Sequence, residues 1–112
     1  MESQPNNNPI AFISKYLIPA ASKETFLARQ ETSRKYIETL PGFIRGHAYD
    51  RTTESGDTEY ITVATWVSEE AINNARDLVQ AENERMGFNR AEMLQKLNIK
   101  MEPGVFREAL AS

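Results

Sequence analysis

Strand-like and helix-like segments follow one another along this chain in an order that few folds accommodate. Apolar and alternating runs predict four strands, at residues 10–18, 43–51, 59–67 and 105–110. Helical spacing of apolar residues predicts helices at 22–40 and 69–86, and a short third helix at 89–97. The order β-α-β-β-α-β with right-handed crossovers predicts an α+β, ferredoxin-like fold, in which a four-stranded antiparallel sheet carries its helices on one face.

Turn and capping residues lie at the expected ends of these segments. Ser22 and Ser68 are suited to cap the two longer helices. Pro41-Gly42 ends the first helix, and Ser55-Gly56-Asp57 predicts a hairpin turn between the middle strands. Pro103-Gly104 predicts a turn or bulge before the last strand.

Two of the predicted strands carry apolar side chains on both faces, although the helices cover only one face of the sheet. A large exposed apolar patch is rare on a monomer, so the uncovered face requires a partner. Sheet-to-sheet packing in a homodimer supplies one. We expect one domain at residues 10–110, preceded by a flexible polar tail at residues 1–9.

The composition argues against several classes of site and partner. The 112 residues include no cysteine and one histidine, which argues against disulfides and metal sites. The net charge is −3 with scattered Lys and Arg, unlike the basic patch typical of nucleic-acid binding. No apolar run reaches membrane-spanning length, and the first residues lack the pattern of a secretion signal, so a cytoplasmic location is expected.

Two short motifs give the chain a family resemblance. They are LPGF at Leu40–Phe43 and TWVSEEA at Thr65–Ala71. With the β-α-β-β-α-β order, they make residues 10–110 similar to the antibiotic biosynthesis monooxygenases, a family of dimeric α+β barrels. The resemblance implies a dimer. Several members oxidise phenols, quinols or anthrones with O2 and no cofactor, others degrade haem or isomerise small molecules, and many have no known activity.

The family's site residues carry over only in part. Trp66 matches a tryptophan that lines the pocket of the quinone-forming oxygenases. Those oxygenases have a tyrosine six residues later and an asparagine four residues earlier, where this chain has Ile72 and Thr62. Haem-degrading members use a histidine in the second helix, which has none here, and His47 lies on the second strand. The resemblance therefore implies no metal, haem or other cofactor.

The first helix has a polar interruption in its inward face. The inward stripe follows helical spacing and reads Phe26, Gln30, Ser33, Ile37 and Leu40. Gln30 and Ser33 either bond locally at the helix edge or face a pocket, and both readings remain open. Alternation places Thr62 and Trp66 together on one face of the third strand. If that face lies beneath the helices, the four residues line a mostly apolar cavity.

Each remaining candidate has a structural alternative. A lone tryptophan such as Trp66 is commonly a core residue, and the resemblance favours a pocket lining. His47 is a candidate general base or an interface or surface histidine. Arg76 and Arg85 are candidate anion ligands or solvated helix charges. The four tyrosines, which the sequence does not rank, are candidate pocket hydrogen-bonding groups: Tyr16, Tyr36, Tyr49 and Tyr60.

The expected function is cofactor-independent monooxygenation of a small electron-rich aromatic molecule, such as a quinol, phenol or anthrone. Trp66 and His47 are the candidate catalytic residues. The candidate substrate-binding residues are Gln30, Ser33, Thr62 and Ile72. The expected partners are a second copy of the chain, the small aromatic molecule and O2. The alternative is a non-catalytic dimeric module that binds a small molecule, which the missing tyrosine favours.

Overall fold

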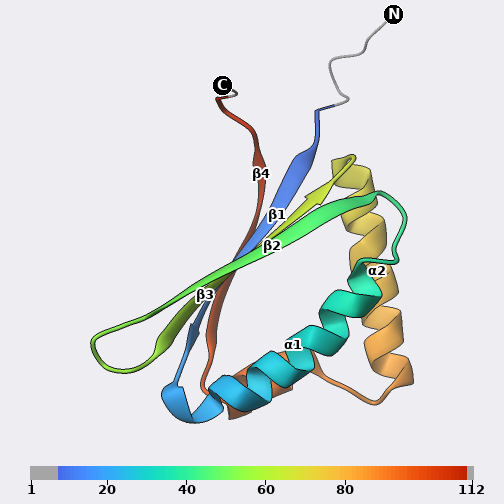
Figure 1. The fold of residues 1–112 in the computed structure, drawn as a ribbon. Helices are drawn as coiled ribbons and strands as arrows, with labels where there is room; N and C mark the ends of the chain where they lie inside the picture. The colour runs from blue at the N-terminus through green and yellow to red at the C-terminus, as the bar shows by residue number, and fades with distance from the viewer. Residues whose placement is uncertain (1–7, 111–112) are drawn as a thin grey trace, which may run out of the picture.

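The computed structural model describes residues 8–110, which form one antiparallel sheet with helices on one face (Figure 1). Its elements are β1 (Ile10–Ile18), the 3-10 turn η2 (Ala20–Ser22), α1 (Lys23–Ile37), β2 (Phe43–Thr52), β3 (Thr58–Trp66), α2 (Glu69–Arg85), α3 (Arg90–Lys96) and β4 (Lys100–Arg107). The strand order is β2-β3-β1-β4, and every neighbouring pair is antiparallel. The predicted ferredoxin-like fold is confirmed. Most of the predicted N-terminal tail, residues 1–7, lies outside the described residues.

The side chains beneath the helices form two separate apolar clusters. The first apolar cluster joins Ile10, Leu40, Trp66, Ile72 and Ala75. The second apolar cluster joins Tyr16, Ile18, Phe26 and Ile99. Both use the even-numbered residues of β1, because successive side chains of a strand point to opposite faces. The even-numbered face of the sheet is therefore the one that the helices cover.

The opposite face of the sheet, which we name the open face, is rich in apolar side chains. Ile13 and Val63 are partners across β1 and β3, and Leu17 lies further along the same face. The outer strands add Tyr49 and Phe106, both exposed large side chains. Both long helices lie on the other side of the sheet (Figure 1), so no described segment packs across this face. The two-sided apolar patterning of the central strands is confirmed.

The two predicted serine caps differ in what their hydroxyls do. Ser68 precedes α2, and its hydroxyl oxygen accepts a hydrogen bond from the backbone N–H of Ala71 at 3.1 Å, as a helix cap does. Ser22 precedes α1, but its side chain makes no capping bond. Instead, the Ser22 hydroxyl donates to the backbone carbonyl of Leu97 at 2.7 Å. Ser22 thus joins the start of α1 to the end of α3.

The last strand begins earlier than the sequence pattern indicates. β4 starts at Lys100 and includes Pro103 and Gly104, which were expected to form a turn before a strand at 105–110. Pro103 pairs with Ser14 of β1, and β4 lies at the edge of the sheet. An edge strand tolerates proline, because the missing N–H can fall on the side without a neighbour. Proline was therefore a misleading stop signal here.

The two motifs that carry the family resemblance meet in the structure. The backbone N–H of Val67 donates to the carbonyl of Gly42 at 2.9 Å. Gly42 has a φ of +86°, and a Cβ atom added there would lie 2.6 Å from the Cβ of Ala71. Phe43 pairs with Trp66 across β2 and β3. The turn after α1 and the start of α2 are thus packed closely enough to require glycine.

Candidate functional site

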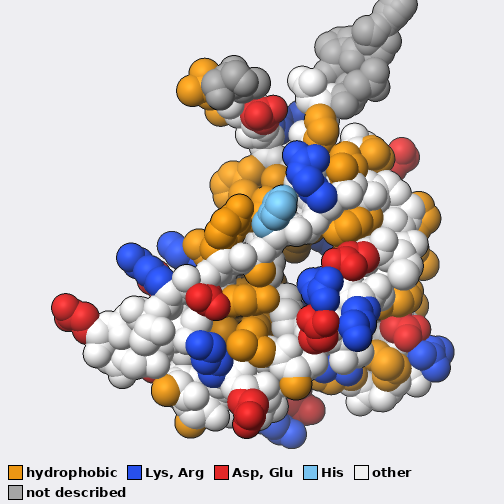
Figure 2. Space-filling model, in the orientation of Figure 1, with side chains coloured by type: hydrophobic (Ala, Val, Ile, Leu, Met, Phe, Trp, Pro, Cys, Tyr) orange, Lys and Arg blue, Asp and Glu red, His pale blue; other side chains and the backbone are white. Residues whose placement is uncertain are grey.

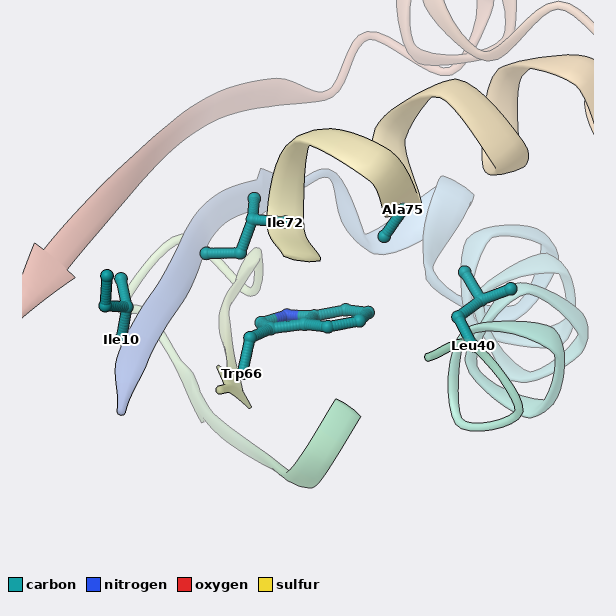
Figure 3. Close-up of a cluster of buried hydrophobic side chains, with 5 residues drawn as sticks. All are labelled: Ile10, Leu40, Trp66, Ile72 and Ala75. Carbon is teal, nitrogen blue, oxygen red and sulfur yellow. The ribbon is translucent and has the colours of Figure 1, made fainter. Parts of the chain in front are cut away.

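Trp66 lies under the helices, on the same face of β3 as Thr62, as alternation predicts for this pair. Its side chain is only 3% exposed and packs among Ile10, Leu40, Ile72 and Ala75 (Figure 3). The Phe43 ring meets the Trp66 ring edge-on, with centroids 5.3 Å apart and an interplanar angle of 84°. Trp66 and Ile72, two of the candidate site residues, are thus brought together inside the first apolar cluster.

The inward stripe of α1 joins both apolar clusters. Phe26 belongs to the second apolar cluster, whereas Ile37 packs against the first. Gln30 and Ser33 lie between them on the same stripe, and both are half-buried. The Gln30 Oε1 atom is buried and accepts no hydrogen bond from any described residue. An unpaired buried acceptor costs roughly 1–3 kcal/mol, so its place in this layer needs an explanation.

The sheet beneath this part of α1 is polar as well. Ser14 of β1 and Thr62 of β3 are partners across the two central strands. On β3, Thr62 lies between Tyr60, which packs against the second apolar cluster, and Trp66, which belongs to the first. Ser14 is only 2% exposed. We name Ser14, Thr62 and Gln30 the central polar patch, since all three lie at the level between the two clusters.

The layer of side chains between the sheet and the helices is open to the surface near the central polar patch. Figure 2 shows the molecule hollowed between β2 and α1, with hydrophobic side chains inside and charged side chains along the rim. On α1, the Arg34 guanidinium pairs with the carboxylates of Glu31 and Glu38, each at 2.7 Å. Asp50 of β2 is the partner of Tyr60 of β3 on the same face. The opening therefore has an apolar interior and a rim carrying both signs of charge.

Tyr60 is an ionisable residue on the helix-covered face, and its surroundings shift its pKa. Burial raises the pKa of the Tyr60 hydroxyl above its usual value of 10.0, and the nearby Tyr16 and the Asp50 carboxylate raise it further. Arg34 of α1 acts in the opposite direction. Tyr60 therefore stays protonated at neutral pH and can donate a hydrogen bond.

His47 does not join the other candidate residues. The irregular pairing between Phe43 and Arg45 sets the register of β2, and His47 pairs with Val63 on the open face. Regular alternation along β2 would put His47 on the same face as Phe43, but the bulge places Phe43 with Trp66 on the other face. Within one chain, the sheet therefore separates His47 from Gln30, Thr62 and Trp66.

The two candidate anion-binding arginines of α2 have partners of their own. The Arg76 guanidinium lies over the Phe12 ring, 5.3 Å from its centroid. The Arg85 guanidinium pairs with the Glu82 carboxylate at 2.7 Å. Among residues 8–110, no three His, Asp or Glu side chains lie together as metal ligands would. In the same part of the chain, no helix is both long and apolar enough to cross a membrane.

Two further hollows lie outside the layer that contains Trp66. One, of about 50 Å³, lies between α1 and α2 and is lined by residues that include Ser33, Tyr36 and Asn83. It has room for only a few water molecules. The other, of about 270 Å³, lies beside α3. Ser33 therefore faces the gap between the helices, while Gln30 is the α1 residue that belongs with the central polar patch.

Sequence reasoning missed Ser14 as a site residue. A signal existed, because Ser14 is a lone hydroxyl between the apolar residues of a strand, on the face of Tyr16. The pairing of Ser14 with Thr62 depends on the register between β1 and β3, which a single sequence does not fix.

No family model matches this sequence, and no curated protein matches it closely enough to count. Solved structures do match. A proposed monooxygenase from Shewanella loihica is 20% identical with a TM-score of 0.70, covering 93% of this chain and 97% of the other. SnoaB from Streptomyces nogalater, a cofactor-independent oxygenase, is 22% identical with a TM-score of 0.64, covering 93% and 96%. A dimeric ferredoxin-like protein from an uncultured marine organism is 7% identical with a TM-score of 0.70, covering 93% and 98%.

This chain has their fold. The likeness to monooxygenases confirms, at the level of the fold, the resemblance that the LPGF and TWVSEEA motifs indicate. At these identities the likeness extends to the fold alone, and the chemistry has to be argued from the side chains of this chain.

Proposed function

We propose that this chain is a cofactor-independent monooxygenase of the antibiotic biosynthesis monooxygenase type, acting on a small electron-rich aromatic such as a quinol, phenol or anthrone. The observation that carries the proposal is the buried Gln30 Oε1 atom without a hydrogen-bond donor. A phenolic hydroxyl is a donor attached to an apolar ring. It would satisfy this acceptor while its ring fills an apolar layer.

The other residues of the layer supply complementary contacts for such a ligand. Trp66 and Ile72 are nearly fully buried and pack behind this layer, where they would hold its apolar side in place. The hydroxyls of Ser14 and Thr62 can donate to a ligand oxygen. Ser33 faces the gap between α1 and α2, so Gln30 is the polar residue that α1 would contribute to the site. In this arrangement the ligand enters through the hollow between β2 and α1 (Figure 2).

The reaction needs no redox group on the protein, because the ionised substrate is itself the reductant. Loss of a proton from the CH2 group of an anthrone gives a carbanion, which transfers one electron to O2. The two radicals combine to form a C–O bond, and protonation gives a hydroperoxide. Loss of water then leaves the ketone, so one oxygen atom enters the product and the other leaves as water. The layer contributes by excluding bulk water and stabilising the anion.

A second candidate function is binding without catalysis, and Ile72 favours it. Ile72 occupies the position at which the quinone-forming oxygenases have a tyrosine, and its side chain is buried against the first apolar cluster. No hydroxyl is available there to donate to an oxygen anion. In this alternative, the same layer holds a small aromatic molecule in a dimeric module.

Oxygen uptake distinguishes the two functions. Protein freed of metals and flavins would be incubated with a panel of dihydroquinones and anthrones in an oxygen electrode. We expect uptake that Gln30→Leu and Thr62→Val each reduce at least tenfold, while the exposed control Gln80→Leu changes it less than twofold. Ligand binding without uptake would select the binding module. If no panel member binds and none causes oxygen uptake, both functions are contradicted.

We also propose that two copies of the chain pack through their open faces. The proposal rests on the apolar side chains of that face, such as Ile13 and Val63, and one structural neighbour is itself described as dimeric. Light scattering of the unaltered protein should give twice the 12.7 kDa chain mass. Val63→Lys should shift it to the monomer, whereas Leu110→Lys, outside the sheet, should not. A 12.7 kDa species of the unaltered protein at micromolar concentration would contradict the dimer.

A further inference from the structure

The structure ranks the four tyrosines that the sequence leaves equal. The Tyr16 hydroxyl accepts a hydrogen bond from the Arg90 guanidinium at 2.5 Å. The Tyr36 hydroxyl donates to the backbone carbonyl of Leu78 at 3.4 Å. Tyr49 is 59% exposed and belongs to the open face. Tyr60 alone lies in the helix-covered layer with no hydrogen bond from its hydroxyl to any residue between 8 and 110.

The Tyr60 ring is held in place by its aromatic neighbours. Its centroid lies 5.9 Å from that of Phe26, nearly edge-on at 82°, and 6.0 Å from that of Tyr16. Phe26 is fully buried, and Tyr16 is anchored by Arg90. An aromatic side chain packed on two sides has few positions available, so its hydroxyl is aimed in advance of ligand binding.

Tyr60 lies on the helix-covered face of the sheet, next to β2 and beneath α1. Asp50 is its strand partner on β2. On α1, the Phe26 ring lies against the Tyr60 ring, with centroids 5.9 Å apart, so both β2 and α1 approach Tyr60. Tyr60 is the neighbour of Thr62 on the same face of β3, on the side of the central polar patch away from Trp66.

We propose that the Tyr60 hydroxyl binds the ketone or phenolate oxygen of the ligand and thereby selects aromatic molecules that carry an acceptor oxygen. This inference rests on the proposed function and narrows its substrate class. An anthrone carries its ketone opposite the CH2 group that reacts. When the CH2 group ionises, negative charge moves onto the ketone oxygen, and a donor aimed there stabilises the anion. Tyr60 would thus take the role that the missing tyrosine leaves vacant, from a different strand.

A matched pair of soluble probes tests this selection. Anthraquinone-2-sulfonate and anthracene-2-sulfonate share ring size and charge but differ in the two ketone oxygens. We expect Tyr60→Phe to weaken binding of the anthraquinone about tenfold, the loss of roughly one hydrogen bond. Its affinity for the anthracene should change less than twofold. Tyr49→Phe, which removes a hydroxyl from the open face, should change neither affinity.

The outcomes separate the selection from the proposed function. If the unaltered protein binds the anthraquinone and Tyr60→Phe binds it equally well, the role of Tyr60 is overturned while the proposed function stands. If the unaltered protein binds neither probe, the role of Tyr60 and the proposed function are both overturned. A second measurement avoids any folding defect of the variant. In the unaltered protein, affinity for the anthraquinone relative to the anthracene should hold beyond the ordinary tyrosine pKa of 10.0, because burial raises the pKa of Tyr60, and should fall at higher pH as the donor ionises. A constant ratio would overturn the selection.

Discussion

Ser14 of β1 and Thr62 of β3 face one another across the two central strands, at the level where neither apolar cluster covers the sheet. A compact domain of this size has little stability to spare, and its centre would be more stable if these positions were apolar. Gln30 adds a buried acceptor without a partner at the same level of α1. These three polar groups are the basis of our proposal that a ligand binds between them.

Removing the unpaired acceptor should stabilise the protein. Gln30→Leu replaces a buried amide with an apolar side chain of similar length, and we expect unfolding to require about 1 kcal/mol more. The same change should weaken ligand binding about tenfold. Urea unfolding followed by circular dichroism measures the first effect, with exposed Gln80→Leu as the control. A Gln30→Leu protein that is less stable by 1 kcal/mol or more would mean that the amide already has a structural partner.

Much of this architecture could be predicted from the sequence, because local patterns determine it. Alternation placed Trp66 and Thr62 on one face of β3, and helical spacing placed Gln30 on the inward stripe of α1. The pairing of Ser14 with Thr62 could not be predicted, because register depends on contacts between distant segments. The face of His47 was partly mistaken for the same reason, since the bulge after Phe43 has no clear sequence signal.

Trp66 should contribute strongly to stability. Its side chain is nearly fully buried among Ile10, Leu40, Ile72 and Ala75. We expect Trp66→Ala to lower the free energy of unfolding by about 3–5 kcal/mol, because it leaves a large cavity. Trp66→Phe should cost less, since it keeps part of the ring. Circular dichroism is the suitable probe, as both variants lose the only tryptophan. A loss below 1 kcal/mol for Trp66→Ala would show that the cavity around it already exists.

Gly42 offers a test of the contact between the two motifs. Gly56→Ala, in the hairpin turn, should cost about 1–2 kcal/mol, because φ is positive there and nothing lies near the added Cβ. Gly42→Ala should cost about 1–3 kcal/mol more, because its Cβ would overlap the Cβ of Ala71. Adding Ala71→Gly should recover part of that difference. Equal losses for the two glycine variants would contradict the close packing.

The raised pKa of Tyr60 predicts a loss of stability in alkali. Below its ordinary value of 10.0 the hydroxyl is protonated in both the folded and unfolded chains, and the pKa shift has no effect. Above that value the unfolded chain loses the proton first, so stability falls as pH rises towards the higher folded pKa. Urea midpoints between about pH 8 and 11.5 should fall more steeply for the unaltered protein than for Tyr60→Phe. Equal slopes would contradict the burial of this hydroxyl.

The most direct test of the proposed chemistry is the origin of the oxygen atom in the product. Protein stripped of metals and flavins would be incubated with anthrone under 18O2, and the quinone analysed by mass spectrometry. We predict that one atom of 18O enters the quinone and one appears in water, and that Gln30→Leu and Tyr60→Phe slow this reaction without changing the labelling. A quinone formed no faster than without protein, or one that takes its oxygen from water, would contradict the account.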